Sequence, residues 1–377
     1  MKLGVIGYGS RIKDVLEEMT KLNPDCQVAA IVDLNRNEES QSKEATGSSK
    51  VQYFHTPEEM VAMAKVDGIL IGTRCSLHTE MALKVLPSRI PLYLEKPVAT
   101  SMIDLRRLKH GYETSRTEVV VSFPLRLTSI IKMVQEIVDS GKIGTIEHVQ
   151  AVNNVPYGSV YYQSWYRDDK ETGGLFLQKA THDFDYINAV LKQTPVSVCA
   201  MTSKQIFKGD KPAELKCCDC AEKKSCLEST AFAEPEIRDK LPYCCFAVDT
   251  GNEDSGSALI RYESGMHVSY SQNFFARRKA GIRGARFLGY KGTVEFDFFT
   301  NTIQVFMHHT PRVETYVIDP GKAHFGGDAA LAENFINIIQ GRASSISPLE
   351  DGLMSALTCI KAKLSAETGT FQRIEYS

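Results

Sequence analysis

The stretch Lys2–Ile12, KLGVIGYGSRI, runs from a short apolar strand directly into a glycine-containing turn. In a dinucleotide-binding fold the first glycine, here Gly7, permits the tight turn. The second, Gly9, lets backbone N–H groups approach a pyrophosphate at the positive end of the next helix. Ile12 stands where the usual fingerprint has a third glycine, so the match is partial. The cofactor-binding residues predicted in this turn are Gly7, Gly9, Ser10 and Arg11.

Outward from this turn, residues 1–122 alternate between apolar strands and amphipathic helices. Such an alternation predicts a parallel sheet that is covered by helices on both faces. Asp33 closes the second strand, where an acidic side chain binds a ribose 2′-hydroxyl, although an acid that caps a turn fits the same position. Arg36 is close enough in sequence to favour a 2′-phosphate instead. We therefore expect NAD, with NADP as the alternative.

Bulk properties limit the class of protein. A chain of 377 residues is longer than one ordinary core, which predicts two domains. The composition, 43% hydrophobic and 24% charged, is typical of a soluble globular protein. A net charge of −2 gives no general attraction to nucleic acid or to anionic membranes. The N-terminus begins with a strand and not with a signal peptide, and no apolar run approaches the roughly 20 residues of a membrane span, so we expect a cytoplasmic protein.

Two motifs in the first domain carry a family resemblance. They are a T-x-x-x-x-H turn and an EKP triplet, formed by Thr73, His78, Glu95, Lys96 and Pro97. Together with the glycine turn, in this order, they make the chain resemble the Gfo/Idh/MocA oxidoreductases. The resemblance implies that Lys96 stands beside the nicotinamide and the substrate hydroxyl, that the Lys96–Pro97 bond is cis, and that Thr73, His78 and Glu95 belong to the cofactor site. Lys96 also follows a predicted parallel strand, at the edge where open α/β sheets bind ligands. For His78, packing or helix capping is the alternative.

The second domain, residues 123–377, changes pattern. Paired strands with a few helices predict an α+β fold on a large, open, mainly antiparallel sheet. The family resemblance continues through this half, except for a cysteine-rich insertion at about 203–250. We expect a homodimer or homotetramer that forms through this sheet.

The stretch Gly173–Leu191, GGLFLQKATHDFDYINAVL, predicts a helix that places Gln178, Lys179 and His182 on one face. In many members of the family this helix carries Asp-x-x-x-His. His182 takes the histidine position, whereas Gln178 replaces the aspartate. Neutral His182 then serves as the base for a substrate hydroxyl, with Lys96 and Lys179 stabilising the developing alkoxide. A buried histidine with only a packing role is the alternative.

Further candidates for substrate binding are Arg126, Tyr157, Trp165, Gln178 and Asp183. Arg126 follows a strand, and a structural salt bridge explains it equally well. Tyr157 and Trp165 belong to an aromatic segment that suits the apolar face of a sugar ring, or else packs at an interface.

The insertion contains Cys217-x2-Cys220-x5-Cys226, with Cys244 further along the chain. Thiolates at these spacings suit a structural zinc ion. An iron–sulfur cluster and free thiols in a loop are the alternatives.

These features predict an NAD(P)-dependent oxidoreductase acting on a secondary hydroxyl or carbonyl of a sugar, inositol or polyol derivative. Two other functions stay open. One is a glycosidase that uses NAD for transient oxidation of the sugar ring, and the other is a non-catalytic NAD-binding regulator.

Overall fold

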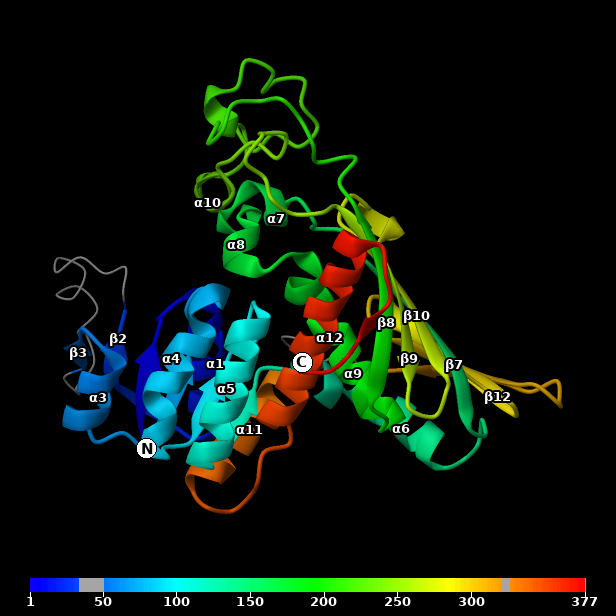
Figure 1. Ribbon diagram of the computed structural model, residues 1–377, viewed down its shortest axis with the longest axis horizontal. Coiled ribbons are helices and arrows are strands. Elements are labelled where there is room, and N and C mark those ends of the chain that lie inside the picture. Colours follow the sequence, from blue (N-terminus) through cyan, green and yellow to red (C-terminus); the bar gives the residue numbers. More distant parts are fainter. Residues whose placement is uncertain (34–50, 320–325, 377) are drawn as a thin grey trace. The chain divides into compact units, whose positions relative to one another are not determined.

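The computed structural model describes residues 1–33, 51–319 and 326–376 and divides into two units (Figure 1). The first unit comprises Met1–Ser129, Pro320–Leu357 and Tyr376. The second comprises Ile130–Asp319 and Thr358–Glu375. Arg36, named above as a residue that would favour a 2′-phosphate, lies outside the described residues.

The first unit is built on a parallel sheet with the strand order β3-β2-β1-β4-β5-β6. Its strands are β1 (Lys2–Ile6), β2 (Gln27–Val32), β3 (Gln52–Phe54), β4 (Gly68–Ile71), β5 (Leu92–Leu94) and β6 (Val119–Val121). The residues of β4, β5 and β6 are buried throughout, as expected for strands that helices cover on both faces. The chain moves from β1 to one side and then returns to place β4 on the other. This reversal creates a switch point between β1 and β4, where sheets of this type bind ligands.

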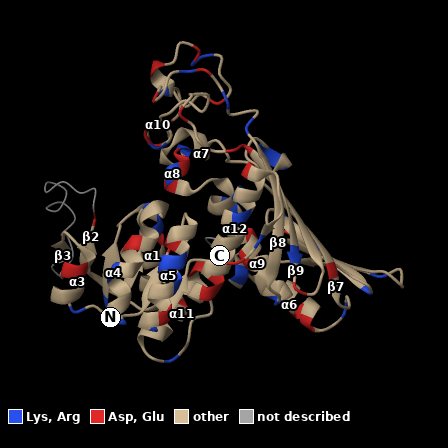
Figure 2. Ribbon diagram, viewed as in Figure 1, with Lys and Arg blue, Asp and Glu red and all other residues tan. Residues whose placement is uncertain are grey.

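The helices of the first unit follow the predicted amphipathic pattern. They are α1 (Ser10–Leu22), α3 (Pro57–Met63), α4 (His78–Val85), α5 (Met102–Ser115) and α11 (Gly327–Ile339). On α1 the buried side chains are Ile12, Val15, Leu16 and Met19, the spacing expected of one apolar face. Figure 2 shows basic and acidic residues mixed along these helices, in keeping with the near-neutral net charge.

Helix α11 belongs to the first unit although it lies more than 300 residues after β1. Its Leu331 and Phe335 share one apolar core with Ile12 of α1, and the Phe335 ring lies 5.6 Å from the ring of Tyr93 on β5. The first unit is therefore discontinuous in sequence, whereas the sequence analysis assigned everything after residue 122 to the second domain. Helix α12 (Leu349–Thr368) crosses from one unit to the other at residue 357.

The second unit contains the predicted large, mainly antiparallel sheet, with the order β14-β13-β12-β11-β7-β10-β9-β8-β15. Its strands are β7 (Ile146–Asn154), β8 (Pro195–Ser203), β9 (Ser255–Tyr262), β10 (His267–Asn273), β11 (Ile282–Gly289), β12 (Gly292–Asp297), β13 (Thr302–Met307), β14 (Val313–Val317) and β15 (Gln372–Arg373). Of the neighbouring pairs in the described sheet, only β7 and β10 run parallel. Burial alternates along β9 and β10, so one face of the sheet is packed and the other is open.

The helices of the second unit include one that lies within the insertion. They are α6 (Ser129–Asp139), α7 (Val160–Gln163), α8 (Asp169–Thr172), α9 (Thr181–Leu191) and α10 (Pro235–Lys240). The stretch Gly173–Leu191 is not one regular helix as predicted. A π-helical turn, Phe176–Ala180, precedes α9. Across the residues that the structure describes, no helix combines the length and apolar character of a membrane span.

Candidate active site

The turn after β1 has the geometry of a phosphate cradle. Gly7 has a φ of +81°, and a Cβ added there would lie 2.8 Å from the backbone nitrogen of Thr73. Only glycine fits this position, because both the left-handed backbone and the close approach exclude a side chain. Gly9 is the N-cap of α1 and provides no side-chain cap, which leaves the first N–H groups of the helix for an anion. The residues present therefore fit a dinucleotide pyrophosphate.

The partial glycine fingerprint has a structural reason. Ile12, in place of the third glycine, is completely buried against the end of β4. A Cβ on Gly72 would lie 2.1 Å from Cγ1 of Ile12, so Gly72 provides the space that the third glycine of the fingerprint usually gives. The helix and the strand still contact each other closely, but the glycine that allows this contact follows the strand and is not in the helix.

The other predicted cofactor residues lie at the same edge of the sheet. Asp33 directly follows β2, and Thr73 follows β4, the strand next to β1. Carboxyl ends of parallel strands meet along one edge, so these residues and the glycine turn belong to the same ligand-binding edge.

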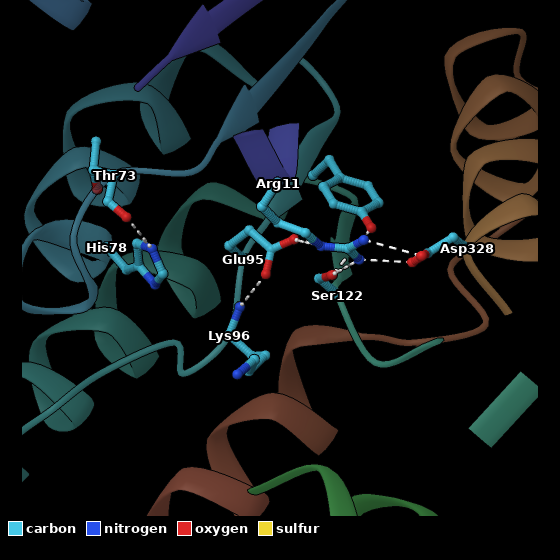
Figure 3. Close-up of polar contacts among 8 residues, drawn as sticks. Arg11, Thr73, His78, Glu95, Lys96, Ser122 and Asp328 are labelled. Carbon is cyan, nitrogen blue, oxygen red and sulfur yellow. Dashed lines mark hydrogen bonds and ion pairs between the residues drawn. The ribbon is translucent and has the colours of Figure 1, made fainter. Parts of the chain in front are cut away.

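His78 joins two loops of this edge. Its Nδ1 lies 2.8 Å from the carbonyl oxygen of Pro97, and its Nε2 lies 3.2 Å from the carbonyl oxygen of Thr73 (Figure 3). The Lys96–Pro97 peptide bond is cis, as the family resemblance implied. Burial lowers the pKa of His78, and the nearby Lys96 charge lowers it further, although both carbonyl contacts and Glu95 act in the opposite direction. These contacts support a packing role for His78, the alternative that the sequence left open.

The lowered pKa of His78 has a consequence for stability. The unfolded chain binds a proton at about pH 6.5, whereas the folded protein resists it, so folding stability is present above that pH and is lost as the pH falls. We expect His78→Gln to remove part of the decrease in unfolding free energy between about pH 8 and about pH 5. Urea unfolding of both proteins at the two pH values measures this difference. If the unfolding free energy changes equally between the two pH values in both proteins, the lowered pKa of His78 is contradicted.

Arg11 forms an ion-pair network with two carboxylates (Figure 3). Its Nε donates to Glu95 at 2.8 Å, and its two terminal nitrogens contact both oxygens of Asp328, at 2.6 and 3.0 Å. Ser122 accepts a further hydrogen bond from Arg11 at 2.9 Å. Burial would lower the pKa of Arg11, but the Glu95 and Asp328 charges raise it well above its ordinary value. The guanidinium of Arg11 thus faces Glu95 and Asp328 within the first unit.

This network also fixes the start of the EKP triplet. The second oxygen of Glu95 accepts the backbone N–H of Lys96 at 3.3 Å. Asp328 and Ser122 were not among the predicted site residues. Asp328 lies in the sequence Gly326-Gly327-Asp328, more than 300 residues after Arg11.

Arg126 forms an ion pair with Asp351, Nη1 to Oδ2, at 2.6 Å. Both residues belong to the first unit. The contact supports the structural salt bridge, which the sequence left open beside a role in substrate binding.

In the second unit, the π-helical turn gathers the predicted catalytic side chains. Gln178, Lys179 and His182 are all buried. The turn begins where one oxygen of Glu253 accepts the backbone N–H groups of Leu175 and Phe176, at 2.9 and 3.0 Å. Burial raises the pKa of Glu253, while these N–H groups act against the rise.

Lys179 lies among aromatic side chains. Its Nζ donates to the Tyr157 hydroxyl at 2.8 Å and lies 4.9 and 5.5 Å from the ring centroids of Tyr157 and Tyr161. Tyr157 is half exposed, whereas Trp165 stacks on Tyr166 with ring centroids 3.9 Å apart. An accessible phenol ring beside a cation is compatible with contact to a sugar ring.

Asp183 is the centre of a buried polar cluster. One oxygen lies 2.8 and 2.7 Å from Nε and Nη2 of Arg283, and the other accepts hydrogen bonds from Asn153 and Tyr270, both at 2.8 Å. Burial by itself would lower the pKa of Arg283, but Asp183, together with the nearby tyrosines, raises it above its ordinary value. Because both oxygens are engaged inside the protein, the contacts favour a structural role over the predicted role in substrate binding.

The cysteine-rich insertion packs under the aromatic segment. Phe207 and Cys245 share an apolar core with Tyr161 and Tyr162. Gln163 donates to the carbonyl oxygen of Glu228 at 2.7 Å. The insertion therefore supports the backbone that carries Tyr157.

The predicted zinc site is not supported. Cys217, Cys220, Cys226 and Cys244 are free thiols, and within the described ranges no three Cys, His, Asp or Glu side chains are arranged to hold a metal ion. The Cys217 thiol instead donates to the carbonyl oxygen of Tyr243 at 3.4 Å. Burial raises the pKa of Cys244, and the neighbouring thiols Cys217, Cys220 and Cys226 raise it further.

Two protein-family models match the chain and show which family it belongs to. Residues 1–123 match the model described as "Oxidoreductase family, NAD-binding Rossmann fold", and residues 131–295 match the "GFO/IDH/MocA C-terminal domain". The chain belongs to the Gfo/Idh/MocA oxidoreductase family. This confirms the resemblance that the glycine turn and the EKP triplet indicated.

Individual relatives of this family member are distant. A putative oxidoreductase, YteT, of Bacillus subtilis is 26% identical over 74% of this chain and 76% of its own length. A myo-inositol 2-dehydrogenase of Thermotoga maritima is 27% identical over 53% of this chain and 58% of its own length.

Solved structures share the fold. An NAD binding oxidoreductase from Klebsiella pneumoniae has a TM-score of 0.78 at 15% identity, covering 100% of this chain and 99% of that one. A putative myo-inositol dehydrogenase from Sinorhizobium meliloti has a TM-score of 0.68 at 20% identity, covering both chains fully.

Proposed function

We propose that the protein is an NAD(P)-dependent dehydrogenase or reductase that transfers a hydride to or from a secondary hydroxyl or carbonyl carbon of a sugar, inositol or polyol derivative. The placement of Lys96 carries this proposal. It follows β5 at the ligand-binding edge of the NAD-binding sheet, between Glu95, which Arg11 holds, and a cis peptide bond. Relatives named as inositol dehydrogenases support the class of substrate.

NAD supplies the hydride acceptor when it is bound. In this proposal Gly7 and Gly9 leave room for its pyrophosphate, and Asp33 accepts a hydrogen bond from a ribose hydroxyl, which favours NAD over NADP. Thr73 completes the same edge.

Two side chains of the protein act on the proton of the substrate hydroxyl and on the negative charge that develops on its oxygen. His182 takes the hydroxyl proton as the hydride leaves, and Lys96 stabilises the developing alkoxide. The assignment of Lys96 and His182 to one hydroxyl group rests on the family resemblance.

A panel of polyols, sugars and sugar acids tests this function. With NAD or NADP, a dehydrogenase gives a steady rise in the absorbance of the reduced nicotinamide. Absence of this signal with every member of the panel, in both directions of reaction, would contradict the proposal and favour a non-catalytic NAD-binding regulator.

A glycosidase with transient oxidation is the second candidate, favoured by the position of Lys179 beside His182 where the family's aspartate is missing. A second cation there would assist formation of an enolate during elimination. Release of the aglycone from aryl glycosides, dependent on NAD but without net NADH, would identify this activity.

We propose that a second copy of the chain covers the open face of the large sheet. Met201 on β8 and Leu259 on β9 expose large apolar side chains there, 76% and 50% accessible, and both line a hollow that extends across the sheet. An apolar face of this extent is typical of an interface between subunits.

We expect the double substitution Met201→Glu, Leu259→Glu to convert the native oligomer into a monomer, as measured by light scattering after size-exclusion chromatography. Leu227→Glu, at a fully exposed position of the insertion, is the matched control and leaves the assembly unchanged. A wild-type monomer at micromolar concentration would contradict the proposal.

A further inference from the structure

Lys179 is a buried cation without a carboxylate partner among the described residues. Its side chain is only 6% exposed, and its contacts are the Tyr157 hydroxyl and the rings of Tyr157 and Tyr161. A phenol and two ring faces stabilise an ammonium group partly, but they do not neutralise it. Burial of a charge is costly unless an opposite charge accompanies it.

The buried carboxylate of Asp183 does not balance the Lys179 charge. Arg283, which interacts electrostatically with Tyr157 and Tyr161, is paired with Asp183, and the second oxygen of Asp183 is engaged by Asn153 and Tyr270. Neutral Gln178 adds no charge. Asp183 is thus committed to Arg283 and is not an ion-pair partner of Lys179.

A ligand that approaches Lys179 from solvent meets Tyr157. The Tyr157 side chain is 50% exposed, and its hydroxyl is the group that Lys179 contacts. The backbone beside it is held closely, because a Cβ added to Gly158 would lie 1.9 Å from the carbonyl oxygen of Phe274. Tyr157 and Lys179 therefore form a preorganised pair, a phenol and an ammonium, at an accessible position.

We infer that this pair binds a carboxylate group of the substrate, so that the substrate is a sugar acid, such as a uronic or aldonic acid. A single lysine balances a single negative charge, whereas a phosphate monoester carries roughly two and calls for a second unpaired cation. The inference rests on the proposed function for the identity of the substrate as a carbohydrate. It also changes the role of Lys179, from stabilising the alkoxide to recognising a group that does not react.

Two matched series test this inference by calorimetry, without turnover. The first compares hexuronates with the parent hexoses and their 6-phosphates, and the second compares aldonates with the parent aldoses. In at least one series we expect the wild-type protein to bind the acid about 10- to 100-fold more tightly than the neutral parent, and more tightly than the phosphate. Acids that bind no better than their parents in both series would overturn the inference, and so would a preference for the phosphate.

Lys179→Met keeps the length of the side chain and removes the charge. We expect this variant to lose the preference for the acid over its parent. Lys192→Met is the matched control, because Lys192 is the C-cap of α9, the helix that follows the turn with Lys179, is exposed and pairs with Asp139. It retains the preference. If the Lys179 variant does not fold, the comparison of acids with their neutral parents on the wild-type protein still tests the inference.

Kinetics separate this role from alkoxide stabilisation. If Lys179 binds the carboxylate, Lys179→Met lowers kcat/KM for the acid about 10- to 100-fold more than for the neutral parent. If Lys179 stabilises the alkoxide, both values fall by the same factor, and the inference is wrong. A large loss of NADH affinity in the variant, measured by fluorescence, would assign Lys179 to the cofactor and also overturn it. Tight binding of the acid without formation of NADH would contradict the proposed function alone.

Discussion

Replacing His182 with asparagine is expected to lower kcat by about 100- to 10,000-fold, with a much smaller change in KM. The substitution removes the group that accepts the hydroxyl proton, while an amide of similar size keeps the helix packed. His182 lies in the first turn of α9, directly after the π-helical turn that carries Lys179. Initial rates of NADH formation at saturating substrate measure the effect.

The control for this substitution is His148→Asn, on strand β7. His148 hydrogen-bonds to the carbonyl oxygen of His267 and has no place in the proposed reaction. Its variant keeps the wild-type kcat. A His182 variant with activity within about threefold of wild type would show that another group accepts the proton.

Lys96→Met separates two roles in the same reaction. The double variant combines Lys96→Met with His182→Asn. If the two residues act on one hydroxyl group, this variant loses little more activity than the less active of the two single variants, because the effects of residues that act as a unit do not add. Losses that multiply would indicate independent roles.

The first unit could be predicted largely from local sequence. Apolar strands, amphipathic helices and the turn at Gly7 are short-range patterns, and each is present in the structure. The pairing of Ile12 with Gly72 could not be predicted, since nothing in the sequence of α1 shows which strand residue faces it. Arg11 was predicted as a cofactor residue from its place in the glycine turn. Its partner Asp328 lies 317 residues away, and only the fold brings the two side chains together.

In the second unit, sequence spacing located the side chains but not their partners. The helical period placed Gln178, Lys179 and His182 on one face, whereas a π-helical turn interrupts the period at this point. The contact between Lys179 and Tyr157 joins residues 22 positions apart and depends on how the segment before α9 folds back. The cysteine spacing suggested a metal site, yet spacing by itself does not fix where the thiols point.

Asp183→Asn is expected to lower the free energy of unfolding by about 3–5 kcal/mol, the usual effect of breaking a buried ion pair by removing one partner. Asp183 is fully buried, and its loss leaves the Arg283 guanidinium charged and unbalanced in the interior. Asparagine keeps one acceptor for Tyr270 or Asn153, so the missing charge causes most of the effect. Chemical denaturation followed by tryptophan fluorescence, with Trp165 as the single tryptophan, measures it.

Asp139→Asn is the matched control, because Asp139 pairs with Lys192 at the surface of the same unit. An exposed pair contributes at most about 1 kcal/mol, so this variant stays close to wild type. Adding Arg283→Met to Asp183→Asn should restore part of the lost stability, since the unbalanced cation is then gone. If Asp183→Asn instead raises KM for the sugar at unchanged stability, the carboxylate contacts substrate as the sequence first suggested, and the structural assignment is wrong.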